Sequence, residues 1–244
     1  MRTMISAWLE SSRRLLRRLR NDMPDAAVDP LLLRHLRGLR VDTVIDVGAN
    51  EGQYGRLLRA AGFRGRIVSF EPLPQTFEVL LSVSRRDRQW DCHQLAIGDR
   101  NDVGEMSVSQ CSVFSSFLPI RSFVHDIQPP SRTIGRERVQ TRTLDSIFPE
   151  LRLDGQIVWL KSDTQGFELQ VLRGADRSLA RFRAIQLEMS IRALYDNQPT
   201  IETMLRYMWE RGFVLSALLQ GFADEKRWEL MEVDGIFVNS MSGA

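Results

Sequence analysis

The chain has 244 residues, of which 43% are hydrophobic and 26% are charged, and its formal net charge is +2. This length and mixture are typical of one medium-sized globular domain, and they exclude a disordered or fibrous chain. Cys92 and Cys111 show no metal-ligand spacing, so neither a zinc site nor a disulfide framework is indicated. No run of about 18 apolar residues is present, and the first residues lack the pattern of a signal peptide. We therefore expect a cytoplasmic protein.

Residues 5–20, ISAWLESSRRLLRRLR, predict a basic amphipathic helix. Apolar side chains, including Trp8, recur at helical spacing, and most of the arginines fall on the opposite face. Such a helix packs on the domain or on a partner subunit, or it docks on an anionic membrane surface, where arginines opposite a tryptophan are suitable chemistry. We expect residues 1–30 to form this helix and a linker, and residues 31–244 to form a single domain.

From Val41 onward, strand-like and helix-like segments alternate. Short apolar strands separated by helices predict parallel pairing with right-handed crossovers, hence a doubly wound α/β sheet with helices on both faces. Such sheets bind ligands at the carboxyl ends of their strands. The expected strands are 43–47, 66–70, 91–95, 157–162, 184–189, 213–217 and 232–238. The expected helices are 31–39, 55–61, 74–84, 166–173 and 201–211.

One connection, between the expected strands 91–95 and 157–162, is too long for a single crossover. It contains two further strand-like pieces, 104–109 and 138–144, and the segment between them is rich in proline and phenylalanine. A long segment of this kind is typical of a mobile loop over a ligand. We expect residues 111–137 to form such a lid.

The sequence VIDVGANEGQY, residues 44–54, runs from the first expected strand into a glycine loop. Gly48 and Gly52 permit a tight turn that brings a ligand close to the backbone, although the loop is neither G-x-G-x-x-G nor a P-loop. Asp46 and Glu51 would repel a pyrophosphate, and the loop holds no lysine or arginine to offset them. A ligand with a cationic end, such as S-adenosylmethionine with its sulfonium and ammonium groups, suits this loop better.

Glu71 follows the second expected strand and lies 19 residues after Gly52 (71 − 52). An acid at this place accepts hydrogen bonds from the ribose hydroxyls of a nucleoside cofactor. The alternative is an ordinary exposed carboxylate at a strand end. The glycine loop, its acidic flank and Glu71 together predict a site for a methyl donor.

In these segments the chain resembles the FkbM-type family of S-adenosylmethionine-dependent methyltransferases. The resemblance rests on DVGANEGQY, GRIVSFEPLPQTFEVL, LAIGD, TLDSI, LKSDTQGFELQVLRGA and IQLEMSIRALYDNQPT, in this order from about Val41 to Val238. It implies the class I methyltransferase fold, a seven-stranded, mostly parallel sheet whose last strand is antiparallel. It also implies O-methylation of a hydroxyl on a sugar, such as a glycan or glycolipid, or on a polyketide-type secondary metabolite.

The resemblance further implies a set of donor-binding residues. Those that match are Asp46, Gly48, Asn50 and Gly52 along the methionine and adenosine side, Glu71 and Pro72 at the ribose, Ala96 with Ile97 at the adenine, and Ser115 in the serine-bearing stretch FSSF. Many relatives carry a glutamate in place of Gln165, so we do not expect a base at this position.

Methyl transfer to a hydroxyl requires in-line attack and loss of a proton, so a base or a metal is expected. Asp163 and Glu188 lie at the ends of the strands 157–162 and 184–189, at the edge of the sheet where the acceptor should bind. We expect one of them to act as the base or to position the acceptor. The alternatives are that Asp163 caps the following helix and that Glu188 pairs with an arginine such as Arg192.

The same two carboxylates, Asp163 and Glu188, could hold Mg²⁺, which prefers oxygen ligands and keeps its waters, although no clear third ligand is visible. His125 in the expected lid is a further candidate for the base, because histidine titrates near neutrality. The alternative for His125 is a merely exposed loop residue. Tyr195 either lines the acceptor pocket or is an ordinary buried tyrosine.

Other functions remain open at this stage. A nicotinamide-dependent oxidoreductase would share the sheet, but the loop argues against it because G-x-G-x-x-G is missing. A non-catalytic donor-binding or scaffold protein, held at a membrane, would share the donor site. We expect no nucleic-acid partner, because no basic surface beyond residues 5–20 interleaves with aromatic residues. If residues 5–20 contact the inner face of a membrane, a lipid-linked sugar becomes the natural acceptor.

Overall fold

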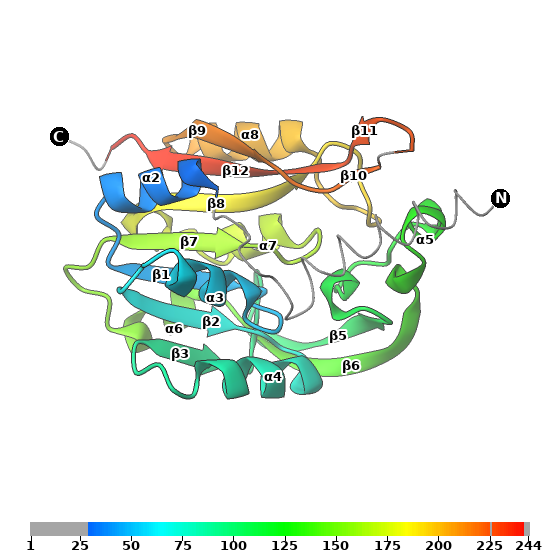
Figure 1. Ribbon diagram of the computed structural model, residues 1–244, viewed down its shortest axis with the longest axis horizontal. Coiled ribbons are helices and arrows are strands. Elements are labelled where there is room, and N and C mark those ends of the chain that lie inside the picture. The colour runs from blue at the N-terminus through cyan, green and yellow to red at the C-terminus, as the bar shows by residue number, and fades with distance from the viewer. Residues whose placement is uncertain (1–28, 225, 242–244) are drawn as a thin grey trace.

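The computed structural model describes residues 29–224 and 226–241. Its centre is a seven-stranded sheet with the strand order β3-β2-β1-β7-β8-β12-β9 (Figure 1). The helix expected over residues 5–20 lies outside the described residues. The strands are β1 Thr43–Val47, β2 Arg66–Phe70, β3 Trp90–His93, β7 Val158–Ser162, β8 Phe182–Ser190, β9 Phe213–Gln220 and β12 Glu232–Asn239.

The main sheet is parallel except for its last strand. β1 pairs in parallel with β2 and β7, and β7 pairs in parallel with β8. β12 lies between β8 and β9 and runs antiparallel to both. The doubly wound sheet and the antiparallel last strand expected from the sequence are therefore confirmed.

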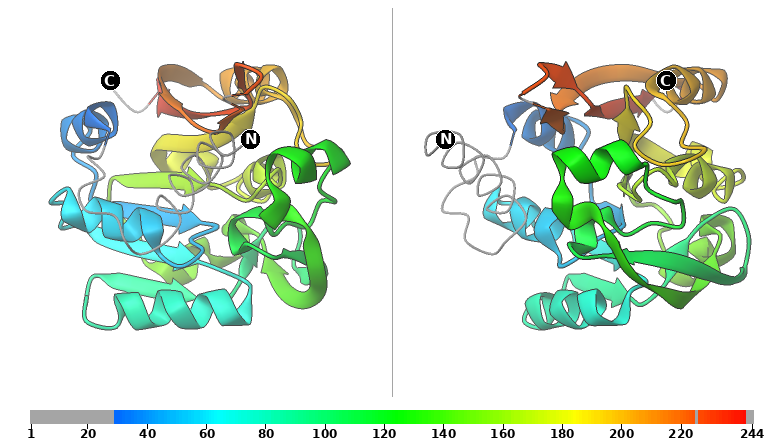
Figure 2. Two further views of the ribbon diagram at one scale, coloured as in Figure 1. Left: turned by 45° about the vertical axis from the view of Figure 1, so that its right-hand side comes forward. Right: turned by 90° about the vertical axis from the view of Figure 1, so that its right-hand side faces the viewer.

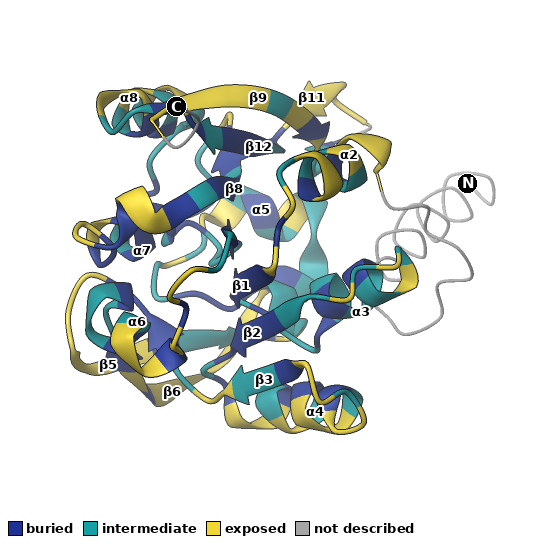
Figure 3. Ribbon diagram, turned by 90° about the vertical axis from the view of Figure 1, so that its left-hand side faces the viewer, coloured by how far each residue is buried: buried dark blue, intermediate teal, exposed yellow. Residues whose placement is uncertain are grey.

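Helices cover both faces of the sheet, so that the central strands are buried on both sides (Figure 3). Side chains of α2, α3 and α4 pack in one apolar cluster, and those of α6, α7 and α8 pack in another. Strands buried on both faces have nearly continuous apolar sequences, which is why β1 and β7 were recognisable. The helices are α2 Pro30–Gly38, α3 Gln53–Ala60, α4 Pro74–Ser84, α6 Leu144–Leu151, α7 Glu168–Arg173 and α8 Ile201–Glu210.

Two charged residues interrupt this apolar centre. Asp46 in β1 and Lys161 in β7 are both buried. The register of the two strands makes them direct neighbours, and their side chains form an ion pair. An isolated charge is costly to bury, so each of these two residues can be buried in the sheet only because the other lies beside it.

A second, three-stranded sheet in the order β4-β6-β5 occupies part of the connection expected to be a lid. β6 begins at Thr133, inside the segment 111–137, and Leu144 begins a helix rather than ending a strand. The first six residues of β6 are all exposed, so no alternation of apolar residues marks this half of the strand in the sequence, and the prediction over 138–144 found only its second half. The strands are β4 Ala96–Ile97, β5 Asp102–Ser109 and β6 Thr133–Arg142.

The third strand of the main sheet is also shorter than expected. It ends at His93 instead of residue 95, because the chain then leaves the main sheet and pairs through β4 with β6. The small sheet therefore begins directly beside the carboxyl end of β3, where it can form one wall of a ligand site.

The remaining lid residues form short elements over the carboxyl ends of the parallel strands, shown in green in Figure 2. Bridges between Ser107 and Ser116 and between Ile120 and Tyr195 fasten this segment to the body of the protein. Among the described residues, no helix is long and apolar enough to cross a membrane. The short elements of the lid are η1 Ser112–Phe114, α5 Ser122–Ile127 and η2 Pro129–Ser131. Outside the lid, the strands β10 Ala223–Asp224 and β11 Glu229–Leu230 form a separate two-stranded sheet.

Gly174 ends α7 where the helix meets the chain after β4. A Cβ atom at Gly174 would lie 1.9 Å from the carbonyl oxygen of Gly98. Gly174→Ala should therefore lower the free energy of unfolding by about 1–3 kcal/mol, because the backbone must move apart. Gly135→Ala is the control, since nothing lies within 4 Å of its Cβ position. Urea unfolding measures both variants, and equal midpoints would contradict this account of the packing.

Candidate active site

A cavity of about 670 Å³ opens at the carboxyl ends of β1, β2, β7 and β8, beside the start of β12. Its volume lies in the range of sites for small molecules and cofactors. Of the described residues that line it, Lys161 is the one basic side chain, while six carry a carboxyl group. These six are Asp29, Glu71, Asp163, Glu188, Glu232 and Asp234. The excess of acidic groups favours a ligand with positive charge.

The loop after β1 brings its backbone directly to this cavity. Gly48 has a φ of 78°, and a Cβ atom there would lie 1.8 Å from the carbonyl oxygen of Asp163, so only glycine fits. Asn50 has a φ of 49°, a conformation that asparagine tolerates better than most residues. Gly48 and Asn50 both line the cavity, as expected, whereas Gly52 does not. Gly52 instead permits the turn into α3, with a φ of 82°.

Glu71 ties this loop to the end of β2. Its Oε2 accepts a hydrogen bond from the backbone N–H of Asn50 at 3.0 Å, and its Oε1 accepts one from that of Leu73 at 2.9 Å. Burial raises the pKa of the Glu71 carboxyl to about 7, although both backbone hydrogen bonds oppose the shift. The expectation of an exposed carboxylate is wrong, because only 5% of Glu71 is exposed and it lines the cavity.

The small sheet and the lid supply the opposite wall of this half of the cavity. Pro72, Ala96, Ile97 and Ser115 all line it, as expected for donor-binding residues. Ser115 is held in place because its Oγ accepts a hydrogen bond from the backbone N–H of Ser109 at 3.0 Å. The rings of Phe117 and Phe167, whose centroids lie 4.8 Å apart, add an aromatic surface. An apolar and aromatic wall facing a carboxyl group suits a nucleoside.

Lys161 lies between two carboxylates at the floor of the cavity. Its Nζ is 3.2 Å from Oδ2 of Asp163 and 3.5 Å from Oδ1 of Asp46. Burial disfavours the ammonium ion, but the charges of Asp163 and Asp46 outweigh burial and raise the pKa of Lys161. The ammonium also lies 5.2 Å from the centroid of the Tyr54 ring. This cluster was not foreseen, although a lysine inside a buried strand was a visible signal.

Asp46 therefore has a different position from the one expected. It is fully buried and does not line the cavity. Burial raises the pKa of its carboxyl, while the charge of Lys161 and hydrogen bonds from Lys161 and Ser69 act in the opposite direction. Asp46 supports the lysine from inside the sheet, and the structure does not bring it to the donor.

Asp163 and Glu188 both line the cavity, close enough together for Nε2 of Gln165 to bond to both of them. Burial would raise the pKa of the Asp163 carboxyl, but the charge of Lys161 and a hydrogen bond from Gln165 hold it below its usual value. Burial and the charge of Asp163 raise the pKa of Glu188 well above its usual value. At neutral pH the carboxyl of Asp163 is thus ionised, whereas Glu188 holds its proton more strongly than an ordinary glutamate does.

The two structural alternatives for these carboxyl groups are wrong. Asp163 does not cap α7, because the carboxyl of Glu168 accepts the hydrogen bond from the backbone N–H of Thr164 at 2.6 Å. Arg192 pairs with Glu229 at 3.2 Å rather than with Glu188. Both Asp163 and Glu188 remain available to a ligand.

Gln165, at which we expected no base, joins the two carboxyl groups. Its Nε2 donates to Oδ1 of Asp163 and to Oε2 of Glu188, both at 2.8 Å. For Tyr195, the second of the two alternatives, a buried tyrosine, is confirmed; its hydroxyl donates to Oε1 of Gln165 at 2.8 Å. Tyr195 is fully buried and does not line the cavity.

His125 lies away from the carboxyl groups. It belongs to α5, and its Nδ1 is 2.8 Å from the hydroxyl oxygen of Ser131. It does not line the cavity. The structure therefore brings Asp163 and Glu188 together but not His125, and its role as a base has no support from geometry.

Mg²⁺ does not fit the carboxyl pair as the structure arranges it. The Lys161 ammonium contacts one oxygen of Asp163, and the Gln165 amide occupies the other. The Lys161 ammonium lies 3.2 Å from Oδ2 of Asp163. A metal ion bound to Asp163 would therefore lie close to this positive charge and be repelled by it. Within residues 29–224 and 226–241, no group of three or more His, Cys, Asp or Glu side chains could hold a metal ion.

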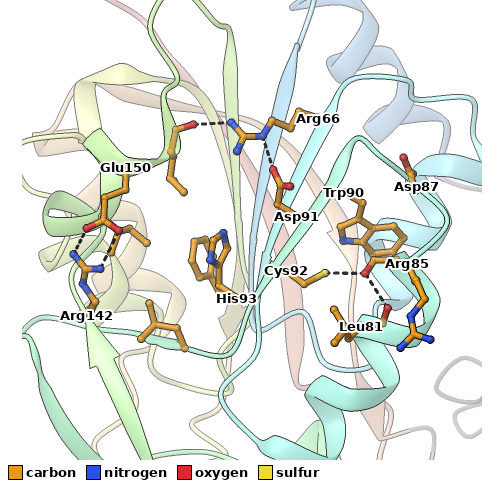
Figure 4. A pocket seen from close by; sticks show the side chains of 15 residues that line it. Arg66, Leu81, Arg85, Asp87, Trp90, Asp91, Cys92, His93, Arg142 and Glu150 are labelled. Carbon is orange, nitrogen blue, oxygen red and sulfur yellow. Dashed lines mark hydrogen bonds and ion pairs between the residues drawn. The ribbon is translucent and has the colours of Figure 1, made fainter.

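A second cavity, of about 480 Å³, lies between β3, α4 and α6 (Figure 4). Its charged side chains are largely paired with one another, as in Arg66 with Asp91 and Arg142 with Glu150. Cys92 donates to the hydroxyl oxygen of Ser84 at 3.2 Å. None of the residues singled out from the sequence as a site lies in it, so we place the ligand in the larger cavity.

The strand order, the glycine loop and the position of Glu71 define a class I S-adenosylmethionine-dependent methyltransferase. Residues 46–215 match the sequence model of the methyltransferase FkbM domain, and the chain belongs to this family. The nicotinamide-dependent oxidoreductase considered from the sequence is thereby set aside.

The chain is also similar to individual proteins. It is 26% identical over 171 residues to the 2-O-methyltransferase NoeI of Sinorhizobium fredii. The matched region covers 66% of this chain and 69% of NoeI. Among solved structures, fibrillarin of Aeropyrum pernix with bound S-adenosyl-L-methionine matches 85% of this chain and 74% of its own, at 14% identity and a TM-score of 0.47. Cofactor-bound Rv0187 from MTB matches 97% and 89%, at 15% identity and a TM-score of 0.48. With such low scores, we rest the fold on its strand order.

Donor binding should depend on the ionisation of Glu71. Only the carboxylate can accept hydrogen bonds from both ribose hydroxyls, and with a pKa of about 7 it is ionised above this pH and protonated below it. The Kd for S-adenosylmethionine should therefore be about tenfold higher at pH 6 than at pH 8. Glu71→Gln should weaken binding and remove this dependence, whereas Glu78→Gln, an exposed control on α4, should keep it. Calorimetry at both pH values decides, and a Glu71→Gln variant that kept the wild-type dependence would rule Glu71 out.

Proposed function

We propose that this methyltransferase methylates a hydroxyl oxygen of a sugar. The observation that carries the proposal is the hydrogen-bonding surface at the acceptor end of the cavity. Besides Asp163 and Glu188, it presents the side chains of Gln186, Glu232 and Asp234. Several carboxyl and amide groups close together suit an acceptor with several hydroxyls better than an apolar polyketide. The name of the similar 2-O-methyltransferase supports oxygen as the acceptor atom.

Asp163 is the better candidate for the base. S-adenosylmethionine, when bound, supplies a methyl carbon activated by a positively charged sulfur. The acceptor oxygen forms its bond to this carbon as the carbon–sulfur bond breaks, and the hydroxyl proton passes to Asp163, which is ionised at neutral pH. Glu188, whose pKa is raised by burial and by the charge of Asp163, can donate a hydrogen bond to a neighbouring sugar oxygen whenever it holds its proton. Lys161 stays charged and holds Asp163 in place.

The proposed acceptor is testable with labelled donor. Incubation with tritium-labelled S-adenosylmethionine and separate lipid and water-soluble extracts, followed by mass spectrometry, should place the label on a sugar oxygen. Asp163→Asn should lower kcat by about 10²–10⁴-fold while donor still binds. Asp154→Asn is the control, because its side chain is 97% exposed. Label on nitrogen or on a polyketide would refute the sugar, and donor binding with no transfer to either extract would favour a scaffold role.

We further propose that the acceptor sugar is linked to a lipid, and that residues 5–20 hold the enzyme at the inner face of the membrane. The supporting observation is the sequence of this segment, with arginines opposite Trp8. Asp29 and Pro30, which follow it in the chain, line the acceptor cavity. In the sequence, residues 21–28 alone separate this segment from Asp29.

Removal of residues 1–20 should abolish sedimentation with vesicles that contain anionic lipids, because the arginines and apolar side chains of this segment supply the attraction. The full-length protein should sediment with anionic vesicles and much less with neutral ones. The truncated protein should keep its affinity for the donor, which calorimetry checks. Equal sedimentation of both proteins would exclude this segment as the membrane contact.

A further inference from the structure

Gln165 lies in the loop after β7 in an unusual backbone conformation. Its φ is 56°, in the left-handed region, and Gly166 follows with a φ of 93°. The carbonyl oxygen of Gln165 accepts a hydrogen bond from the hydroxyl of Ser116 at 2.7 Å. A left-handed conformation is unfavourable for a residue with a side chain, so it is kept only where surrounding contacts hold it. Residues in such conformations are concentrated at functional sites. The question is what the side chain of Gln165 does there.

The amide of Gln165 makes three hydrogen bonds of equal length. Its two N–H groups serve Oδ1 of Asp163 and Oε2 of Glu188, and its oxygen accepts from the hydroxyl of Tyr195, all at 2.8 Å. An amide has two N–H donors, so each carboxyl group receives one of them. Only the carboxamides of glutamine and asparagine provide two N–H donors and one oxygen acceptor in this planar arrangement, and asparagine is shorter by one methylene group.

Asp163 and Tyr195 together determine the direction in which the amide points. Its hydroxyl is buried, 2.8 Å from Oε1 of Gln165 and 3.2 Å from the carbonyl oxygen of Phe114. Asp163 is ionised and can only accept hydrogen bonds, so an amide turned over would place its oxygen against the carboxylate. The ionised Asp163 thus selects the orientation that serves both carboxyl groups, and the hydroxyl of Tyr195 stabilises it by donating to the amide oxygen.

We propose that Gln165 is a positioning residue for methyl transfer, whose amide holds Asp163 and Glu188 together and aims Asp163 at the acceptor hydroxyl. The proposal rests on the function proposed above, in which Asp163 is the base. Gln165 and both carboxyl groups line the cavity, so the held pair faces the acceptor. Ser116 donates to the backbone carbonyl oxygen of Gln165, and Tyr195 donates to its side-chain amide oxygen. Both the backbone and the side chain of Gln165 are therefore held in place.

The neutrality of the amide matters at this position, because the surroundings are strongly acidic. A glutamate in place of Gln165 would add a further carboxyl group between two that already interact, without a hydrogen-bond donor for either in its ionised form. The amide connects the pair and adds no charge. The charged and titratable groups that face the pair are Asp46, Tyr54, Lys161, Glu168, Tyr195, Glu232 and Asp234.

The first test needs no acceptor. Gln165→Leu removes all three hydrogen bonds at similar volume, so the ¹³C NMR titration of the Asp163 carboxyl should move up by about one pH unit or more. Gln165→Glu should move it further in the same direction. Gln170→Leu, on the neighbouring α7, is the matched control and should leave it unchanged. The same titration midpoint in wild type and Gln165→Leu would overturn the proposal.

The second test measures turnover with the sugar acceptor. Gln165→Leu should lower kcat by about 10²-fold, while the donor Kd and the acceptor KM change less than about threefold, because only alignment is lost. Tyr195→Phe keeps the amide but frees its orientation, and should lower kcat by about tenfold even if Gln165→Leu fails to fold. A loss explained wholly by weaker donor binding would overturn the proposal. Full turnover of Asp163→Asn would instead refute the proposed base, and the NMR titration separates the two failures.

Discussion

The ion pair of Lys161 with Asp46 and Asp163 is the interaction on which the site depends. It lies at the centre of the sheet, where β1 and β7 are in register, and all three side chains are wholly or largely removed from water. A buried charge is tolerated only when partners compensate it, so the lysine and the two carboxyl groups require one another. One consequence is that Asp163 remains ionised at the floor of an otherwise acidic cavity.

This arrangement leaves the cavity with more acidic groups than Lys161 can balance. Burial raises the pKa of Glu71 to about 7, of Asp234 to about 6 and of Glu232 to about 8. These carboxyl groups retain protons at pH values where they would lose them in water. The folded state is therefore less stable at high pH: stability is lost as the pH rises from about 4, the pKa of an ordinary carboxyl group, through the raised pKa values. A ligand that brings positive charge relieves this cost. S-adenosylmethionine carries a sulfonium and an ammonium group, so the charge of the empty site favours the donor that the family uses.

The sequence predicted the parts of this structure that local patterns determine. The central strands and the glycine loop were recognised, because apolar strands and a turn with left-handed residues are encoded within a few neighbouring positions. β6 was predicted over 138–144 and only its second half was recognised, because its first six residues are exposed and only pairing with β5 makes them a strand. The partner of Asp46 was missed for a different reason: β7 follows β1 by more than a hundred residues, and only the strand order makes Lys161 its neighbour. Likewise, the orientation of Gln165 depends on Tyr195, which is 30 residues away.

The same contacts explain how donor and acceptor can be aligned. The backbone N–H of Asp163 donates to the carbonyl oxygen of Val47 at 3.0 Å, and the absence of a side chain at Gly48 lets the two loops touch. The donor loop after β1 and the acid after β7 are therefore braced against each other by the backbone itself. In-line displacement needs the acceptor oxygen, the methyl carbon and the sulfur on one line, and small displacements are costly in rate. In the proposed reaction the first of these loops would hold the donor and the second would carry the proton acceptor, so the packing of two adjacent strands would set this alignment before either ligand binds.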